Sequence, residues 1–262
     1  MTSAREKLLR YYKGTEGEET AVRLVDLAEQ AMRTQKFRLS GFLDGFGVEI
    51  AEAVAANYDG LHVDFDGGYQ GAERQRAMLV HDAFGGHPEF NIVVLKAVWK
   101  QEFSRIGHRD VLGALMGLGI ERDCLGDILM SGGTARIITD KKMAEFLKEN
   151  CSAFGATAIR WEDDEVENII PREEKTKDIN ATVASLRADA IAASGYGISR
   201  SKAAADIEAE KLKINWQTVK SASQTVKQGD VLSLRGRGRV EVAEVRGTTK
   251  KGRVSVLLKR FY

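Results

Sequence analysis

The chain has 262 residues, 43% of them hydrophobic, so it is long enough to bury two or three small cores and is not a disordered polymer. No stretch approaches the roughly 20 apolar residues of a membrane-spanning helix, and the first residues, "MTSAREKLLRYYKG", lack the apolar segment of a signal peptide. The two cysteines, Cys124 and Cys151, have no histidine partners at metal-ligand spacing. We therefore expect a cytoplasmic protein with reduced thiols and without membrane contact, metal or cofactor.

The formal net charge of +1 hides a division between the two ends of the chain. Residues 182–262 carry 16 Lys and Arg against 7 Asp and Glu, whereas residues 1–181 carry 23 against 31. The C-terminal part is therefore strongly basic and the remainder acidic. Such asymmetry indicates that the basic part faces a polyanion.

Helices dominate the expected fold of residues 1–75. The segment "AVRLVDLAEQAMRT" spaces its apolar residues along one helical face, and we expect helices from residue 1 to about residue 58. The segments "LHVDFDGG" and "RAMLVHDAF" then predict a pair of strands joined by the loop "GGYQGAE". We thus expect a helical N-terminal domain at residues 1–75, with a strand pair at its end.

Residues 76–165 are expected to form a middle domain with the element order β-α-β-β-α-β. The segments "FNIVVLKAVW", "GDILM", "TARIIT" and "ATAIRW" have strand character, and "HRDVLGALMGLGI" and "KKMAEFLKENCSAF" have helical spacing. This order is that of the ferredoxin-like fold, which RRM-type RNA-binding domains share. The fold class by itself assigns no function.

Basic residues gather where the first helix of the middle domain is expected to begin. Arg105, His108 and Arg109 lie there, and Asp110 takes a first-turn position that favours an acid. A bound phosphate would explain the cluster. An ordinary solvated helix start, in which Asp110 pairs with an arginine, would explain it equally well.

The segment "EDDEVENIIPREEKTKDIN" is highly charged and contains one of the two prolines, and we interpret residues 166–181 as a linker. Beyond it, "ASLRADAIAASG" and "SRSKAAADIEAEK" predict two short helices. Gly195 is the expected left-handed end of the first helix, and Ser199 the expected N-cap of the second. Arg200 and Lys202 then lie at a helix start, where the helix dipole favours an anion, so we expect a phosphate there.

Basic strands and turns follow these helices. In "KLKINW", strict alternation predicts a packed face of Leu212, Ile214 and Trp216. The opposite face is formed by Lys211, Lys213 and Asn215. The segment "GDVLSLRGRGRVEVAEV" predicts a hairpin that displays Arg235, Arg237 and Arg239 near its tip. Each of these basic clusters, taken alone, is explained by the need to keep strand edges soluble. Taken together, they favour the interpretation of a phosphate-binding surface.

The C-terminal residues resemble the RNA-binding domain named after small-subunit ribosomal protein S4. The family pattern of Arg-Leu-Asp, Ser-Arg-Ser, Gly-Lys-Val-x-Val-Asn and Val-x-x-Gly-Asp has counterparts here in "RAD", "SRS", "EKLKIN" and "VKQGD". Ala188 replaces the usual leucine and Glu210 the usual glycine. Through "GHRDVLGALMGLGIERDCLGDI" and "GGYQGAERQRA", nearly the whole chain is similar to the YlmH family.

This resemblance implies an α+β protein with a helical N-terminal domain, an RRM-like middle domain and a small C-terminal α/β S4 domain at residues 182–262. It also implies a non-enzymatic factor that binds rRNA of the large ribosomal subunit or tRNA. Such a factor would act in the quality control of stalled peptidyl-tRNA complexes, together with other quality-control factors. The RNA-binding residues expected are Arg187, Arg200, Ser201, Lys202, Lys211, Lys213, Asn215, Arg235, Arg237, Arg239, Arg105, His108 and Arg109.

Two alternatives remain open. S4 domains also occur in RNA-modifying enzymes, such as pseudouridine synthases and rRNA methyltransferases, and family members have been associated with cell division. Against an enzyme, the upstream residues contain no His-Glu-x-x-His or Gly-x-Ser-x-Gly motif and no complete phosphate loop, so we expect no catalytic residue. The second alternative is an adaptor for division machinery, in which the basic tail is incidental.

Overall fold

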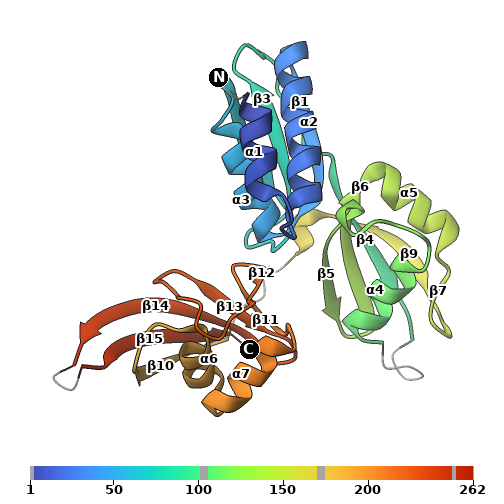
Figure 1. Ribbon diagram of the computed structural model, residues 1–262. Coiled ribbons are helices and arrows are strands. Elements are labelled where there is room, and N and C mark those ends of the chain that lie inside the picture. Colours follow the sequence, from blue (N-terminus) through green and yellow to red (C-terminus); the bar gives the residue numbers. More distant parts are fainter. Residues whose placement is uncertain (1–2, 101–105, 170–174, 250–251, 262) are drawn as a thin grey trace. The chain divides into compact units, whose positions relative to one another are not determined.

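The computed structural model describes residues 3–100, 106–169, 175–249 and 252–261 (Figure 1). The chain divides into two compact units, Met1–Pro171 and Arg172–Tyr262. The first unit contains an N-terminal lobe and a middle lobe, each with its own sheet. Mixed helix and strand content throughout confirms the α+β class.

The N-terminal lobe packs helices against a small antiparallel sheet with the strand order β1-β3-β2. Its elements are α1 (Ala4–Tyr12), α2 (Glu18–Thr34), β1 (Phe37–Leu43), α3 (Gly45–Ala55), β2 (Leu61–Asp66) and β3 (Gln75–His81). Ser3 and Glu6 form a capping box at the start of α1, and Asp44 caps α3. These caps define where the helices begin.

The expectation of helices up to residue 58 is wrong at β1. Phe37–Leu43 is a strand whose register with β3 shifts between Leu39 and Phe42. This bulge breaks the alternation of buried and exposed residues that identifies a strand in sequence. The expected domain boundary after residue 75 is also wrong, because β3 begins at Gln75 and pairs with both β1 and β2.

The middle lobe has the predicted β-α-β-β-α-β order. Its main elements are β4 (Ile92–Val98), α4 (His108–Met116), β5 (Leu125–Ser131), β6 (Thr134–Asp140), α5 (Lys141–Asn150) and β9 (Arg160–Asp164). The antiparallel sheet order β5-β6-β4-β9 is that of the ferredoxin-like fold. Short elements fill the connections: η2 (Arg122–Cys124), the hairpin β7 (Ala153–Phe154) and β8 (Thr157–Ala158), and η3 (Val166–Asn168).

The C-terminal unit is a six-stranded antiparallel sheet, and α6 and α7 pack on one of its faces (Figure 1). Its elements are β10 (Thr176–Val183), α6 (Ala188–Tyr196), α7 (Arg200–Glu208), β11 (Leu212–Ile214), β12 (Gln217–Thr218), β13 (Val231–Leu234), β14 (Gly238–Thr248) and β15 (Val254–Phe261). The strand order is β10-β15-β14-β13-β11-β12. The hairpin expected within residues 229–245 is present as β13 and β14.

Residues 176–181, expected as linker, instead belong to β10, which pairs with β15 along its whole length. Most side chains of β10 are exposed and polar, but Ile179, Ala181 and Val183 alternate onto the hydrophobic core of the unit and help to hold the strand in the sheet. The expected linker therefore extends too far toward the C-terminus.

Two helix ends in this unit take left-handed conformations. Gly197, with φ +63°, ends α6, in place of the expected Gly195. Gly195 lies inside the helix, where an added Cβ would come within 2.7 Å of a Val240 methyl carbon. Glu210, with φ +53°, ends α7: its N–H donates to Ile207 O and the N–H of Lys211 to Asp206 O, both at 2.9 Å, in a Schellman arrangement.

Candidate nucleic-acid interface

Arg187 and Arg200 share one buried carboxylate. Arg187 donates from Nε and Nη2 to the two oxygens of Asp189, both at 3.2 Å. Arg200 donates to the same carboxylate from Nε at 3.0 Å and from Nη2 at 3.3 Å. Burial alone would raise the pKa of Asp189, but the hydrogen bonds from Arg187 and Arg200 outweigh it and lower the pKa below its usual value.

Lys202 and Lys211 share a second buried carboxylate. The Nζ of Lys202 lies 3.1 Å from Asp206 Oδ1, and the Nζ of Lys211 lies 3.6 Å from the same oxygen. The hydrogen bond from Lys202 is the largest influence and lowers the pKa of Asp206. Asp206 therefore stays ionised and holds both ammonium groups.

We call the six residues Arg187, Asp189, Arg200, Lys202, Asp206 and Lys211 the anchored basic cluster. It has four cations and two anions, and so an excess of positive charge. The carboxylate side chains are 7% exposed, whereas those of Arg200 and Lys202 are each 52% exposed. The two buried carboxylates therefore hold the cations in place, while the side chains of Arg200 and Lys202 stay accessible to a ligand.

The anchored basic cluster also explains the cations at the start of α7. Ser199 caps the helix as predicted, accepting from Lys202 N–H at 3.1 Å, and its Oγ lies 3.1 Å from Ser201 Oγ. The dipole at this end disfavours cations, but Asp189 on α6 lies against Arg200 and offsets the cost.

The β13–β14 turn continues the basic surface. The N–H of Arg235 donates to Lys211 O at 3.0 Å, which joins this turn to the anchored basic cluster. Arg235 and Arg237 are exposed on either side of Gly236, whose φ is +81°. The turn thus displays two guanidinium groups beside Lys211.

Lys213 and Arg239 lie on the sheet face opposite to the helices. Register aligns Lys213 with Ser233, Ser233 with Arg239, and Arg239 with Phe261. The Arg239 guanidinium lies 5.5 Å from the centre of the Phe261 ring. These two cations therefore face a different side of the unit from α6 and α7.

Asn215 has a structural role. With Trp216 it forms the two-residue turn between β11 and β12, and both residues have positive φ, +46° and +63°. Its Oδ1 accepts from Val231 N–H and its Nδ2 donates to Asp230, both at 2.9 Å. The alternation expected through Asn215 and Trp216 is therefore wrong: the strand ends at Ile214, and Trp216 is 37% exposed instead of packed.

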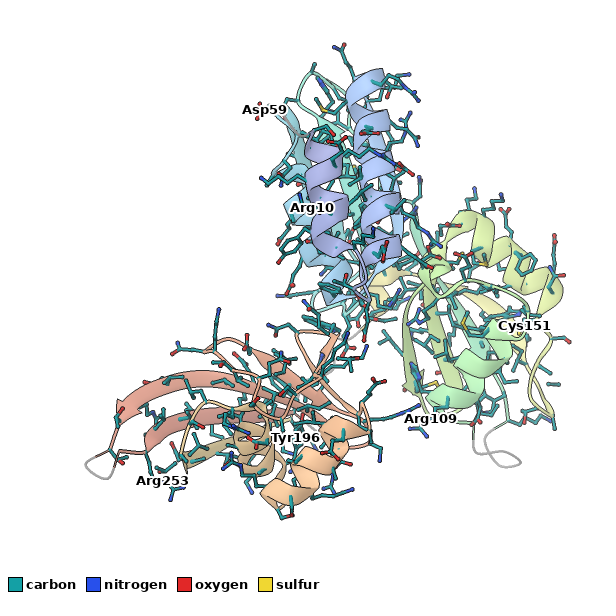
Figure 2. The ribbon with its side chains drawn as sticks, in the orientation of Figure 1. Arg10, Asp59, Arg109, Cys151, Tyr196 and Arg253 are labelled. Carbon is teal, nitrogen blue, oxygen red and sulfur yellow. The ribbon has the colours of Figure 1, made fainter. Side chains whose placement is uncertain are left out.

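In the first unit, His108 and Arg109 are exposed in the opening turn of α4 (Figure 2 labels Arg109). Asp110 accepts from Gly107 N–H at 2.8 Å, which caps the start of the helix. Arg105, the third residue expected here, lies outside the described residues. His108 and Arg109 remain accessible candidates for phosphate contact.

The sheet of the middle lobe lacks the stacking platform of an RRM. RRM sheets stack bases on aromatic side chains, but β4 and β6, its two central strands, contain no aromatic residue. Val94 and Ile138, on the face away from the helices, are buried against Phe42 of β1 and Ile169. Ion pairs at 3.2 Å (Lys96 with Glu162) and 2.7 Å (Arg136 with Asp164) occupy the same face.

The two segments that carry the whole-chain resemblance meet between the two lobes. In one, Tyr69 Oη and Glu73 N–H donate to Asp127 of the other at 2.8 and 2.7 Å. Arg74 donates from Nε to Leu125 O at 3.1 Å and from Nη2 to Phe42 O. These segments therefore join the lobes.

Arg122 completes this junction, donating from Nη1 to Leu125 O and Gly126 O at 2.5 and 3.1 Å. Both β1 and β5 have register shifts here, which leave carbonyl groups outside the ladder for Arg74 and Arg122 to satisfy. Burial, followed by the charge of Arg74, lowers the pKa of Arg122 to about 10.

A cleft of about 660 Å³ lies beside this junction, between α2, β1 and η2. Its charged lining consists of Arg23, Arg74, Arg122, Asp26, Asp44, Glu121 and Asp123. Acids outnumber arginines, so the cleft does not favour a polyanion. Among the described residues, no group of three His, Cys, Asp or Glu side chains is placed to hold a metal ion.

Sequence reasoning missed the anchoring acids and the junction. Asp189 follows Arg187 by two residues and Asp206 follows Lys202 by four, the spacing of a helical ion pair, so a local signal existed for both. Asp127 and Arg74 gave no such signal, because their partners lie far away in the sequence. Arg122 gave none either, because it donates to nearby backbone carbonyls, which any residue type provides.

Three family models match successive parts of the chain. Residues 16–84 match the YlmH N-terminal domain, residues 86–168 the RNA-binding domain in YlmH, and residues 186–232 the S4 domain. Fold, basic surface and matches together define a multidomain RNA-binding protein with a C-terminal S4 domain. The chain belongs to the YlmH family, as the resemblance of its sequence predicted.

A curated relative supports this assignment. The chain is 32% identical over 226 residues to "Ribosome-associated protein quality control protein P2" of Bacillus subtilis (strain 168), an alignment that covers 86% of this chain and 88% of the relative. The solved structure of "Cell division protein ylmH from Streptococcus pneumoniae" has a TM-score of 0.50 at 23% identity, covering 59% of this chain and 95% of that one. This likeness supports the fold. None of the described helices has the length and apolar character needed to cross a membrane.

Proposed function

We propose that the protein is a non-enzymatic factor whose S4 domain binds structured RNA of the large ribosomal subunit, or tRNA held on it, through backbone phosphates. The anchored basic cluster carries this proposal. Two buried carboxylates hold four cations in place while leaving Arg200 and Lys202 half-exposed, so little side-chain entropy is lost when a phosphate binds.

The remaining candidates extend the surface. Arg235 and Arg237 reach a neighbouring phosphate beside Lys211, the Ser201 hydroxyl adds a donor at the start of α7, and Lys213 and Arg239 contact RNA that passes the other face of the sheet. In the middle lobe, Arg105, His108 and Arg109 provide a separate contact at the start of α4, because the covered sheet face is closed to bases.

The cellular role proposed follows the name of the Bacillus subtilis relative. We infer that the protein acts in the cytoplasm in ribosome-associated quality control, on large subunits that retain peptidyl-tRNA and alongside other quality-control factors. It contributes binding and no chemistry of its own. The family assignment and the S4 domain support this role.

Cosedimentation with purified large ribosomal subunits, together with filter binding of free tRNA, tests the proposal. At low salt we expect the protein to bind large subunits, more tightly when peptidyl-tRNA is present, and Arg200→Glu with Lys202→Glu to weaken binding at least tenfold. Because bound phosphates release counterions, the logarithm of affinity should fall linearly with that of salt concentration.

Lys177→Glu is the matched control, since Lys177 is an exposed lysine of the same unit outside the anchored basic cluster. It should have little effect on binding. The proposal fails if the unaltered protein binds neither the large subunit nor tRNA at low salt. It also fails if Lys177→Glu weakens binding as much as Arg200→Glu with Lys202→Glu does. Conversion of nucleosides in the bound RNA would identify an RNA-modifying enzyme instead.

A further inference from the structure

The turn between β11 and β12 contains a tryptophan in a backbone conformation that tryptophan rarely adopts. Trp216 has φ +63°, and the preceding Asn215 has φ +46°. Two-residue hairpin turns with both φ values positive favour Asn-Gly, because glycine has no Cβ to clash with the backbone. Asn is present here, but a large aromatic side chain takes the position of glycine.

The surrounding structure maintains this conformation. Asn215 is held by Asp230 and by the N–H of Val231, and Ile214 pairs with Gln217 across the turn. Strained backbone conformations of this kind persist where contacts with neighbouring residues hold them, and they are concentrated at binding sites. The strain itself does not identify a ligand, so the kind of ligand is inferred from the exposure of the indole and the charge around it.

The indole is accessible. Trp216 is 37% exposed, and among the large hydrophobic side chains described in the C-terminal unit it stands out in this respect. It lies outside the hydrophobic core of the unit, which includes Ile214 and Leu212 of the same hairpin. Packing of the unit therefore does not account for a tryptophan at this position.

The segment that contains the hairpin is basic in sequence. Between Lys211 and Gly229 the sequence contains Lys211, Lys213, Lys220 and Lys227 and no Asp or Glu. Cationic side chains and an exposed aromatic ring in one segment are features with which proteins hold single-stranded nucleic acid, the cations contacting phosphates and the ring stacking on a base. An exposed tryptophan within a protein-protein contact would need no such charge.

We propose that Trp216 stacks on an unpaired nucleobase of the bound RNA. This inference rests on the proposed function, because it assumes that the C-terminal unit binds RNA through the anchored basic cluster. The S4 domain would then hold paired RNA by phosphates and recognise an adjoining unstacked base with the β11–β12 turn. The ligand at this site is an RNA base of any identity, since every base offers a face for stacking.

The test uses the full-length protein and two synthetic RNAs: a blunt duplex, and the same duplex with a three-nucleotide single-stranded 3′ extension. The unaltered protein should prefer the extended RNA by about 5- to 100-fold, the range expected for stacking on a single base. Trp216→Gly should remove this preference without weakening binding to the blunt duplex. Trp216→Phe should retain most of it.

Trp216→Gly restores the Asn-Gly pair that this turn favours, so the variant is expected to fold, and its thermal unfolding confirms this independently. A preference unchanged in Trp216→Gly overturns the stacking inference, even where Arg200→Glu abolishes binding to both RNAs. That outcome leaves the proposed function intact and points to a protein partner for the indole. Absence of binding to either RNA by the unaltered protein contradicts the proposed function, and with it this inference.

Discussion

Arg200, in the first turn of α7, donates from its Nε to Oδ2 of Asp189, in the first turn of α6, at 3.0 Å. The contact links the starts of two helices that are separate elements in the sequence. It gives a cation at a helix N-terminus a fixed partner, while the Arg200 side chain remains 52% exposed. The charge that would otherwise oppose the helix dipole becomes an ordered binding group.

Asp189→Asn should lower both the stability of the protein and its affinity for RNA. The variant is one unit more positive, so a purely electrostatic surface would bind RNA more tightly. We expect weaker binding instead, because Arg187 and Arg200 lose the carboxylate that orients them. The buried amide, facing two guanidinium groups, should also cost about 1–3 kcal/mol of unfolding free energy.

RNA affinity at constant ionic strength and thermal unfolding measure these two effects. Lys177→Gln changes the net charge in the opposite direction at an exposed site of the same unit and serves as the control. An increase in RNA affinity for Asp189→Asn would show that Asp189 acts on RNA binding through its negative charge and not by orienting Arg187 and Arg200.

The pH dependence of stability should report on Asp206. Its pKa is lowered in the folded protein by the hydrogen bond from Lys202, so the stabilisation from its ionised form is fully present above the unfolded pKa of about 3.9. It is lost as the pH falls through the lower, folded pKa, because protonation then favours the unfolded chain.

Comparison of the protein with Asp206→Asn isolates this contribution. The difference in unfolding free energy between the two should be constant at neutral pH and shrink as the pH falls below about 4. Urea unfolding at a series of pH values measures it. A difference that persists undiminished at pH 2 would contradict ionisation of Asp206 as the source of the stabilisation.

Glu210→Gly should stabilise the C-terminal unit. Glu210 occupies the left-handed position of a Schellman motif at φ +53°, where a side chain costs about 1 kcal/mol and glycine does not. Glu208→Gly, the same substitution in the last residue of α7, should lower stability, because glycine inside a helix is unfavourable. Thermal unfolding of the two variants should therefore shift in opposite directions.

Arg74→Lys should destabilise the junction between the two lobes of the first unit. Arg74 donates to carbonyl oxygens of β1 and β5 from two different nitrogens, which a single ammonium group cannot reproduce. We expect a loss of about 1–3 kcal/mol in unfolding free energy, from a carbonyl left buried without a donor. Arg23→Lys, at a more exposed arginine beside the same cleft, should change it by less than about 1 kcal/mol.

Local patterns in the sequence predicted much of the structure correctly. The β-α-β-β-α-β order of the middle lobe follows from apolar spacing, and the N-cap at Ser199 follows from residue type. The strand β1 was missed because its bulge disrupts the alternation. The strand β10 was missed because its many exposed polar residues obscure the apolar alternation of Ile179, Ala181 and Val183. Both errors arise where pairing with a distant strand outweighs local preference.

The sequence by itself determined that the C-terminal part is basic, that a cation-bearing helix begins after Ser199, and that the chain resembles the YlmH family, because charge, caps and motifs are local properties. Only the tertiary structure decided which cations are held and by what. Asp189 and Asp206 become anchors because folding buries them beneath cations from other elements, where a carboxylate is stable only when paired. The tertiary structure likewise closed the sheet face of the middle lobe with Phe42 and left Trp216 exposed at a strained turn, since both depend on contacts between residues far apart in the chain.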